Sequence, residues 1–131
     1  LYVYHQTHGI PFTILRYGNV YGPRQDPHGE AGVVAIFAQA MLNGKQPIIY
    51  GDGEQERAFV YVADVVQANV SSLENGDGGV YNIGTEVGTS VNHIAQSLQG
   101  IIKFRGTVEY GPPRDGDVLK IYLLIIFYHQ Y

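Results

Sequence analysis

Two arginines stand in loops beside predicted strands, where they could bind a phosphorylated ligand. Arg57 comes just before a predicted strand at residues 58–61, and Arg114 lies in a proline-flanked loop at 112–117. A guanidinium fork binds phosphate oxygens in a bidentate manner, so two arginines converging from separate loops would clamp a pyrophosphate. The alternative is that each is a solvated surface charge, which is the commoner environment for an arginine. Their spacing in the sequence leaves both interpretations open.

A second candidate site follows the predicted strand at residues 12–17, which runs into a glycine-rich segment at 18–24. Ligands of open α/β sheets bind at the carboxyl ends of strands. There Asn19 would offer hydrogen-bond donors and an acceptor, and Tyr17 would place a phenol beside a ring. The alternative, which composition alone favours, is that Asn19 only builds a turn and Tyr17 packs in the core.

The histidines show no pattern typical of a metal site. His5 and His8 stand three residues apart at the end of a short predicted helix, where a cationic last turn is the commoner reason for such a pair. No pair has the i, i+4 spacing with a nearby carboxylate that a helical metal site shows. For His28 and Glu30, in a long loop, solvation is favoured over an acid–base pair. We therefore predict no metal site.

The elements that carry these residues alternate between strand and helix, which predicts an α/β fold. A first short helix ends at Gly9, and the segment at 18–32 is predicted to be one long loop. Ser90 or Thr89 can cap the last helix. The predicted strands are 12–17, 46–50, 58–61, 80–83 and 108–110, and the other predicted helices are 33–43, 63–75 and 90–100.

Composition limits the classes of function. The chain has 131 residues, 45% of them hydrophobic and 15% charged, which predicts one globular domain and excludes a natively unfolded chain. With a net charge of −4, the chain lacks the basic surface that binding to nucleic acid or an anionic membrane needs. Cysteine is absent, which excludes disulfides and thiolate metal sites and fits a cytoplasmic protein. The sequence has no Gly-x-Gly-x-x-Gly after a strand, no P-loop and no His-Glu-x-x-His.

The two ends differ from those expected of a complete domain. The chain opens in the last turns of a helix, and we expect most of that helix to lie upstream. Residues 123–131 continue an apolar run far shorter than the roughly 20 residues of a membrane helix. The run could form a buried strand, but we expect this tail to be foreign to the domain, as a shifted reading frame would make it. Left exposed, it would favour aggregation.

Five segments, in order along the chain, carry a resemblance to a known family. They are LRYGNVYGPRQDP at 15–27, HGEAGVVAIF at 28–37, IYGDGEQ at 49–55, FVYVADVV at 59–66 and VYNIGT at 80–85. Together they resemble the NAD-dependent epimerase/dehydratase family, the extended short-chain dehydrogenases, and the second is most similar to its UDP-glucose 4-epimerases. The resemblance implies an incomplete α/β fold of Rossmann type, with the last strand of the Rossmann sheet and the small substrate-binding region. We thus predict that residues 1–122 are the C-terminal, substrate-binding part of such an enzyme.

The resemblance also implies an activity and a set of binding residues. The family member would be a nucleotide-sugar epimerase, an isomerase whose NAD takes a hydride from C4 of the hexose and returns it to the other face. Its implied substrate is a UDP-sugar, and Tyr17 is implied to lie against the nicotinamide end of NAD. The implied substrate-binding residues are Asn19, Val33 and Arg57 for the phosphates, Ile48 and Tyr50 for uracil, and Arg114 with Asp117 for phosphate and ribose.

The sequence departs from the family pattern in ways that bear on activity. It has no glycine-rich NAD loop and no Tyr-x-x-x-Lys pair, so we predict no catalytic residue and no activity for the isolated chain. Ala58 stands where the family has an aspartate after the arginine, so an acidic partner for Arg57 is missing. After Asp117 and Val118 the family's Asp-x-Ser-Lys-Ala segment is also missing.

Two alternatives remain at this stage. One is a nucleotide-sugar 4,6-dehydratase, whose distinguishing residues would lie upstream of this chain. The other is a non-catalytic nucleotide-binding or structural module. For the isolated chain we expect aggregation, or unfolding without a cooperative transition, because a half-domain exposes the apolar faces that missing strands would cover. Self-association would bury those faces, and the apolar tail offers one route.

Overall fold

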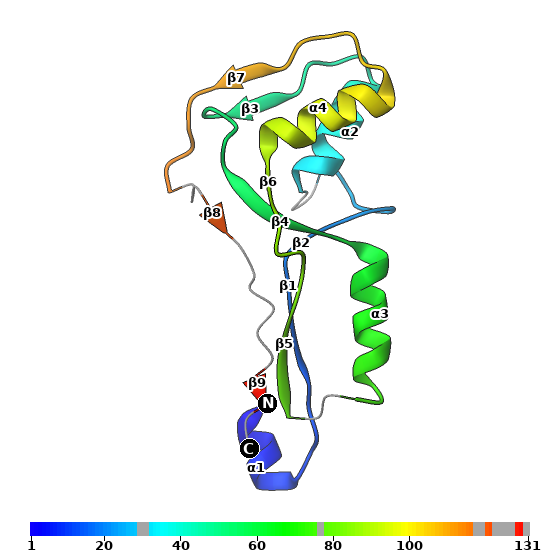
Figure 1. Ribbon diagram of the computed structural model, residues 1–131, viewed down its shortest axis with the longest axis vertical. Coiled ribbons are helices and arrows are strands. Elements are labelled where there is room, and N and C mark those ends of the chain that lie inside the picture. Colours follow the sequence, from blue (N-terminus) through cyan, green and yellow to red (C-terminus); the bar gives the residue numbers. More distant parts are fainter. Residues whose placement is uncertain (29–31, 76–77, 117–119, 122–127, 130–131) are drawn as a thin grey trace.

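The computed structural model shows an elongated α/β chain in which three small sheets follow one another along the long axis (Figure 1). The structure describes residues 1–28, 32–75, 78–116, 120–121 and 128–129. Helix α1 (Tyr2–His8) lies at one end of the molecule, and helices α2 (Val33–Leu42) and α4 (Val91–Ile102) lie together at the other. The predicted α/β class is confirmed.

The first sheet joins strands from distant parts of the chain. Strand β1 (Ile14–Tyr17) pairs in parallel with β5 (Gly79–Ile83), which pairs on its other side with the antiparallel β9 (Tyr128–His129). Helix α3 (Val62–Ser72) runs beside β1 and β5 (Figure 1). Gly9 ends α1 in a left-handed conformation with φ of 64°, as its position after a short helix predicts.

A single residue, Gly18, separates the first strand from the strand that begins the second sheet. Strand β2 (Asn19–Tyr21) pairs in parallel with β4 (Glu56–Tyr61), which also pairs with β6 (Gly88–Ser90) and β8 (Lys120–Ile121). The Gly18 amide donates to the Ile83 carbonyl at 2.9 Å, so Gly18 is the last residue tied to the first sheet. The expectation of one loop over 18–32 is therefore wrong at its start. A strand of three residues is too short to show a period in the sequence.

The core of the molecule lies where α2 and α4 cover the third sheet, formed by β3 (Ile48–Tyr50) and the parallel β7 (Glu109–Gly111). Of the two predicted caps, Ser90 is the one that caps α4, since its Oγ accepts from the His93 amide at 3.2 Å. Helix α4 continues past Gly100 to Ile102, because Ile102 and the following Phe104 pack against the core. The buried residues of this cluster are Phe37, Met41, Ile49, Val91 and Ala95.

The chain exposes much surface for its size. Its accessible area is 9245 Å², whereas a folded monomer of 14.5 kDa exposes about 6,900 Å². Large apolar side chains stand in solvent at opposite ends of the molecule, among them Leu1 at 72% and Ile101 at 77% exposure. Among the described residues, no helix is both long and apolar enough to cross a bilayer.

Candidate functional site

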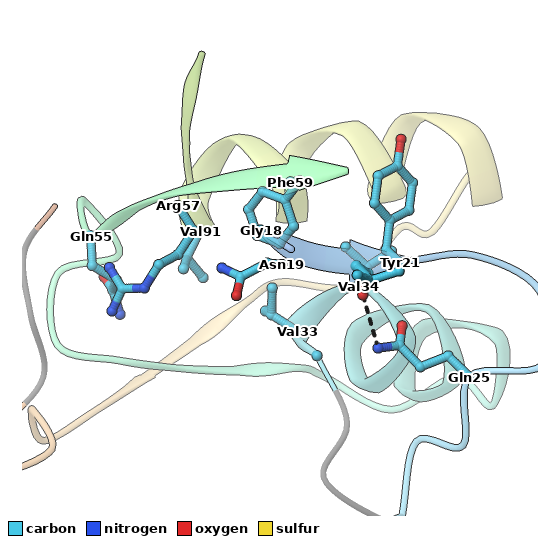
Figure 2. A pocket seen from close by; sticks show the side chains of 12 residues that line it. Gly18, Asn19, Tyr21, Gln25, Val33, Val34, Gln55, Arg57, Phe59 and Val91 are labelled. Carbon is cyan, nitrogen blue, oxygen red and sulfur yellow. Dashed lines mark hydrogen bonds between the residues drawn. The ribbon is translucent and has the colours of Figure 1, made fainter. Parts of the chain in front are cut away.

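A pocket of about 370 Å³ opens over the second sheet, and two predicted residues point into it from neighbouring strands. In the β2–β4 pairing, Asn19 stands opposite Phe59, and Arg57 lies two residues earlier on the same face of β4. Figure 2 shows the Asn19 amide and the Arg57 guanidinium directed toward the same space, with Val33 at the start of α2 beside them. The sheet register therefore brings Asn19 and Arg57 together, and the start of α2 adds Val33.

The backbone of its own strand helps to hold Arg57 in place. Its Nη1 donates to the Glu56 carbonyl at 2.9 Å. Ala58, the residue that replaces the family's aspartate, is 3% exposed on the opposite face of the strand. Backbone thus supplies one support for the guanidinium.

A second hollow, of about 200 Å³, lies against the third sheet. Strand β3 alternates, so that Ile49 is buried in the core while Ile48 and Tyr50 face outward into the hollow. Arg114 follows β7 and lies over Tyr50, with its Cζ 4.2 Å from the ring centroid, which is cation–π contact. The parallel pairing of β3 and β7 brings these two predicted residues together.

The two hollows and a third of about 500 Å³ adjoin one another. Val33 and Gln55 line both the first and the second, while Tyr50, Gln55 and Arg114 line both the second and the third. We call this continuous depression the groove. The groove combines two guanidinium groups and a helix N-terminus, which suit an anion, with an aromatic ring at one end, which suits a planar group.

Tyr17 and Asp117 are not placed with the others. The Tyr17 hydroxyl donates to Asn69 Oδ1 on α3 at 3.0 Å, and Tyr17 does not line the groove as the described residues form it. Asp117 lies outside the described residues. Its role stays a prediction, as do the roles of the residues in the groove.

Gln55 is the residue that analysis of the sequence missed. It lines all three hollows, and its Nε2 donates to the Tyr50 carbonyl at 3.0 Å. Val91, at the start of α4, lines two of them. A signal for Gln55 was present, since it sits in the turn between the strands that carry Tyr50 and Arg57. No such signal marked Val91, whose position depends on how α4 packs.

The described residues offer few groups that could hold a metal ion or a cofactor. No group of three or more potential metal ligands occurs among the residues that the structure describes. His5 hydrogen-bonds the Ile10 carbonyl at 3.0 Å, and the His8 ring lies against that of Tyr4. For a dinucleotide, the chain offers the end of β1 without a Gly-x-Gly-x-x-Gly loop, and the Tyr17 phenol there is bonded to α3. These residues do not by themselves form an NAD site.

The first 84 residues, which carry β1, β2 and Arg57, match a family model described as the NAD dependent epimerase/dehydratase family. The chain belongs to this family. Its predicted α/β fold of extended short-chain dehydrogenase type is thereby confirmed, and so is the resemblance to NAD-dependent enzymes.

Similar members of the family are UDP-glucose 4-epimerases. A putative UDP-glucose 4-epimerase of Methanocaldococcus jannaschii is 51% identical over 92% of this chain and 39% of its own length. The UDP-glucose 4-epimerase of Thermotoga maritima, solved with UDP-glucose, has a TM-score of 0.92 and 51% identity over 95% of this chain and 40% of its own. The Thermus thermophilus enzyme, solved with NAD, has a TM-score of 0.85 and 42% identity over 95% of this chain and 41% of its own. The chain thus spans about two-fifths of the relatives it matches.

Proposed function

We propose that this chain supplies the UDP-sugar-binding part of an epimerase of the UDP-glucose 4-epimerase type. The observation that carries the proposal is the groove, in which Arg57 and Arg114 stand in adjoining hollows on different sheets. Two cations along one depression suit a diphosphate, whose negative charge is spread over two phosphate groups. Similarity to epimerases, one of them solved with UDP-glucose, supports the same ligand class.

The groove suggests an order for the parts of the ligand. The pyrophosphate would lie between the two guanidinium groups, near the first amides of α2, which have no partner within a helix. The uracil would lie in the apolar hollow beside Ile48 and Tyr50. The hexose would then extend beyond the phosphates and Asn19, over the second sheet.

The hydride chemistry of epimerisation belongs to NAD, and this chain would contribute the anchoring of the substrate. Remote binding energy of this kind holds a reactive sugar in position. Because the sequence has no Tyr-x-x-x-Lys pair, we expect the 131-residue chain with added NAD not to interconvert UDP-glucose and UDP-galactose. Chromatography of the sugar nucleotides checks this, and measurable turnover by the pure chain would contradict it.

A binding experiment tests the proposal itself. The chain is immobilised at low density for surface plasmon resonance, so that its molecules cannot associate, and is exposed to UDP-glucose, UDP and uridine. We expect both diphosphates to bind, and uridine to bind at least about tenfold more weakly, because each charge-assisted hydrogen bond to a phosphate contributes about 1.5–3 kcal/mol. Equal binding of uridine and UDP, or no binding of either, would reject the proposal.

Val33 offers a pair of variants that isolates the effect of charge on binding; because Val33 also packs against the core, both variants lose the same apolar contact. A carboxylate in the first turn of a helix stabilises it by about 0.3–1 kcal/mol, but at this position it would also repel a phosphate in the groove. We therefore expect Val33→Asp to bind UDP about tenfold more weakly than Val33→Asn, by roughly 1.4 kcal/mol, while the two variants have the same helix content by circular dichroism. Val33→Asn, which has similar size and no charge, is the matched control. Equal affinities for the two variants would remove Val33 from the phosphate site.

Self-association is a further proposal for the isolated chain. Exposed apolar side chains on α1 and α3, such as Tyr4 and Val70, would be covered in an assembly. Sedimentation velocity over a range of concentrations tests this, and a monomer at every concentration would count against it.

A further inference from the structure

One asparagine outside the groove, Asn92, hydrogen-bonds two separate segments of the chain that carry groove residues. Asn92, the second residue of α4, does not line the groove among the described residues, yet its side chain hydrogen-bonds the turn at 51–55 and strand β7. Its Nδ2 donates to the Asp52 carbonyl at 2.9 Å and to Glu54 Oε1 at 2.6 Å. Its Oδ1 accepts from the Tyr110 hydroxyl at 3.0 Å.

Those bonds fix the turn between β3 and β4. Besides its side-chain bonds, Asn92 donates its backbone amide to the Gly53 carbonyl at 3.0 Å, and Val91 donates to the Gln55 carbonyl at 3.3 Å. The turn at 51–55 is thus bound to the start of α4 at Asp52, Gly53, Glu54 and Gln55. Gln55 in turn lines the groove, and its side chain bonds the Tyr50 carbonyl.

The same amide also holds the other strand. Tyr110 belongs to β7, which leads through two prolines to Arg114. One side chain therefore connects the segment that carries Tyr50 and Gln55 with the segment that carries Arg114. An asparagine suits this position, because its amide can donate two bonds and accept another at once.

A glycine in the turn at 51–55 allows the Asn92 side chain to approach closely. Gly53 has a φ of 76°, in the left-handed region that favours glycine. A Cβ on Gly53 would collide with the Asn92 amide. Gly53 and Asn92 therefore depend on one another, although 39 positions separate them in the sequence.

We propose that Asn92 is a positioning residue, which sets the spacing between Tyr50 and Arg114 that a nucleoside diphosphate requires. This inference rests on the proposed function, because it assigns Asn92 a role in binding that ligand. Asn92 does not touch the ligand; it acts through the turn at 51–55 and through β7.

Affinity and amide exchange test the inference together. We expect Asn92→Ala to weaken binding of UDP about 5- to 20-fold, the size of one or two ordinary hydrogen bonds, and to speed hydrogen exchange at 51–55 while the middle of α4 keeps its protection. Gln96→Ala, an exposed position on the same helix, is the control and should change neither. Should Asn92→Ala unfold the chain, Tyr110→Phe serves in its place, since it removes one hydroxyl from an exposed ring.

A double-mutant cycle separates positioning from general stability. If Asn92 acts by placing Arg114, its loss costs less affinity once Arg114 is alanine, so the two effects are not additive. Additive effects, or an Asn92→Ala chain that binds UDP as the unsubstituted chain does, would overturn the inference. An unsubstituted chain that fails to bind UDP would instead reject the proposed function, and amide exchange would still decide whether Asn92 holds the turn.

Discussion

Replacing Arg114 with alanine is expected to weaken binding of UDP-glucose about 10- to 100-fold, because a hydrogen bond to a charged group contributes about 1.5–3 kcal/mol. Arg114 stands where the second and third hollows of the groove meet, and its guanidinium lies over the Tyr50 ring. That contact holds the fork beside the groove, so little conformational freedom is lost when phosphate binds. Surface plasmon resonance on the immobilised chain measures the change.

Two variants control for charge and for geometry. Arg105→Ala removes the same charge from an exposed position away from the groove, and should leave affinity unchanged. Arg114→Lys keeps the charge but loses the planar fork, and should give an intermediate loss. An Arg114→Ala chain with unchanged affinity, or an equal loss in Arg105→Ala, would show that Arg114 does not bind the phosphates.

Replacing Ile49 with alanine is expected to cause the largest loss of stability. Ile49 is 1% exposed and joins β3 to the core formed by α2 and α4. Truncating a buried isoleucine to alanine costs about 2–5 kcal/mol, through lost burial and the cavity left behind. Exchange of the most protected amides in α2 and α4 should accelerate about 30-fold or more, as that free energy requires.

The same substitution on the surface provides the control. Ile101 is 77% exposed on α4, so Ile101→Ala should change stability by no more than about 0.5 kcal/mol. Ile48→Ala, next to the core residue but facing the groove, should reduce nucleotide affinity more than stability. Equal effects of Ile49→Ala and Ile101→Ala would mean that the β3 strand is not part of the core.

The sequence predicted most of the helices and strands because their signals are local. The end of α1 at Gly9 and the cap of α4 at Ser90 depend on residues within one turn. The strand β2 escaped prediction because its pairing with β4 is made by residues about 40 positions away. A three-residue strand becomes visible only when its partner is in place.

In the groove, too, the sequence predicted what depends on a single residue and missed what depends on contacts between distant residues. Arg57 and Arg114 were candidates from their side-chain chemistry, but sequence spacing left open whether they meet, and the sheet pairings place them in adjoining hollows. Asn92 drew no attention in the sequence, since an asparagine early in a helix is ordinary. Its hydrogen bonds to Glu54 and Tyr110 arise only after α4 has packed against the third sheet.

Amide hydrogen exchange of the chain with and without UDP-glucose most directly tests whether the groove binds the nucleotide sugar. We predict that the ligand slows exchange in the turn at 51–55, in the first residues of α2 and around Arg114, where the groove is formed. Exchange in α1 should stay the same, because that helix lies at the far end of the molecule (Figure 1). Protection confined to α1 or α3, or no protection at a saturating concentration of UDP-glucose, would contradict a nucleotide-sugar site in this groove.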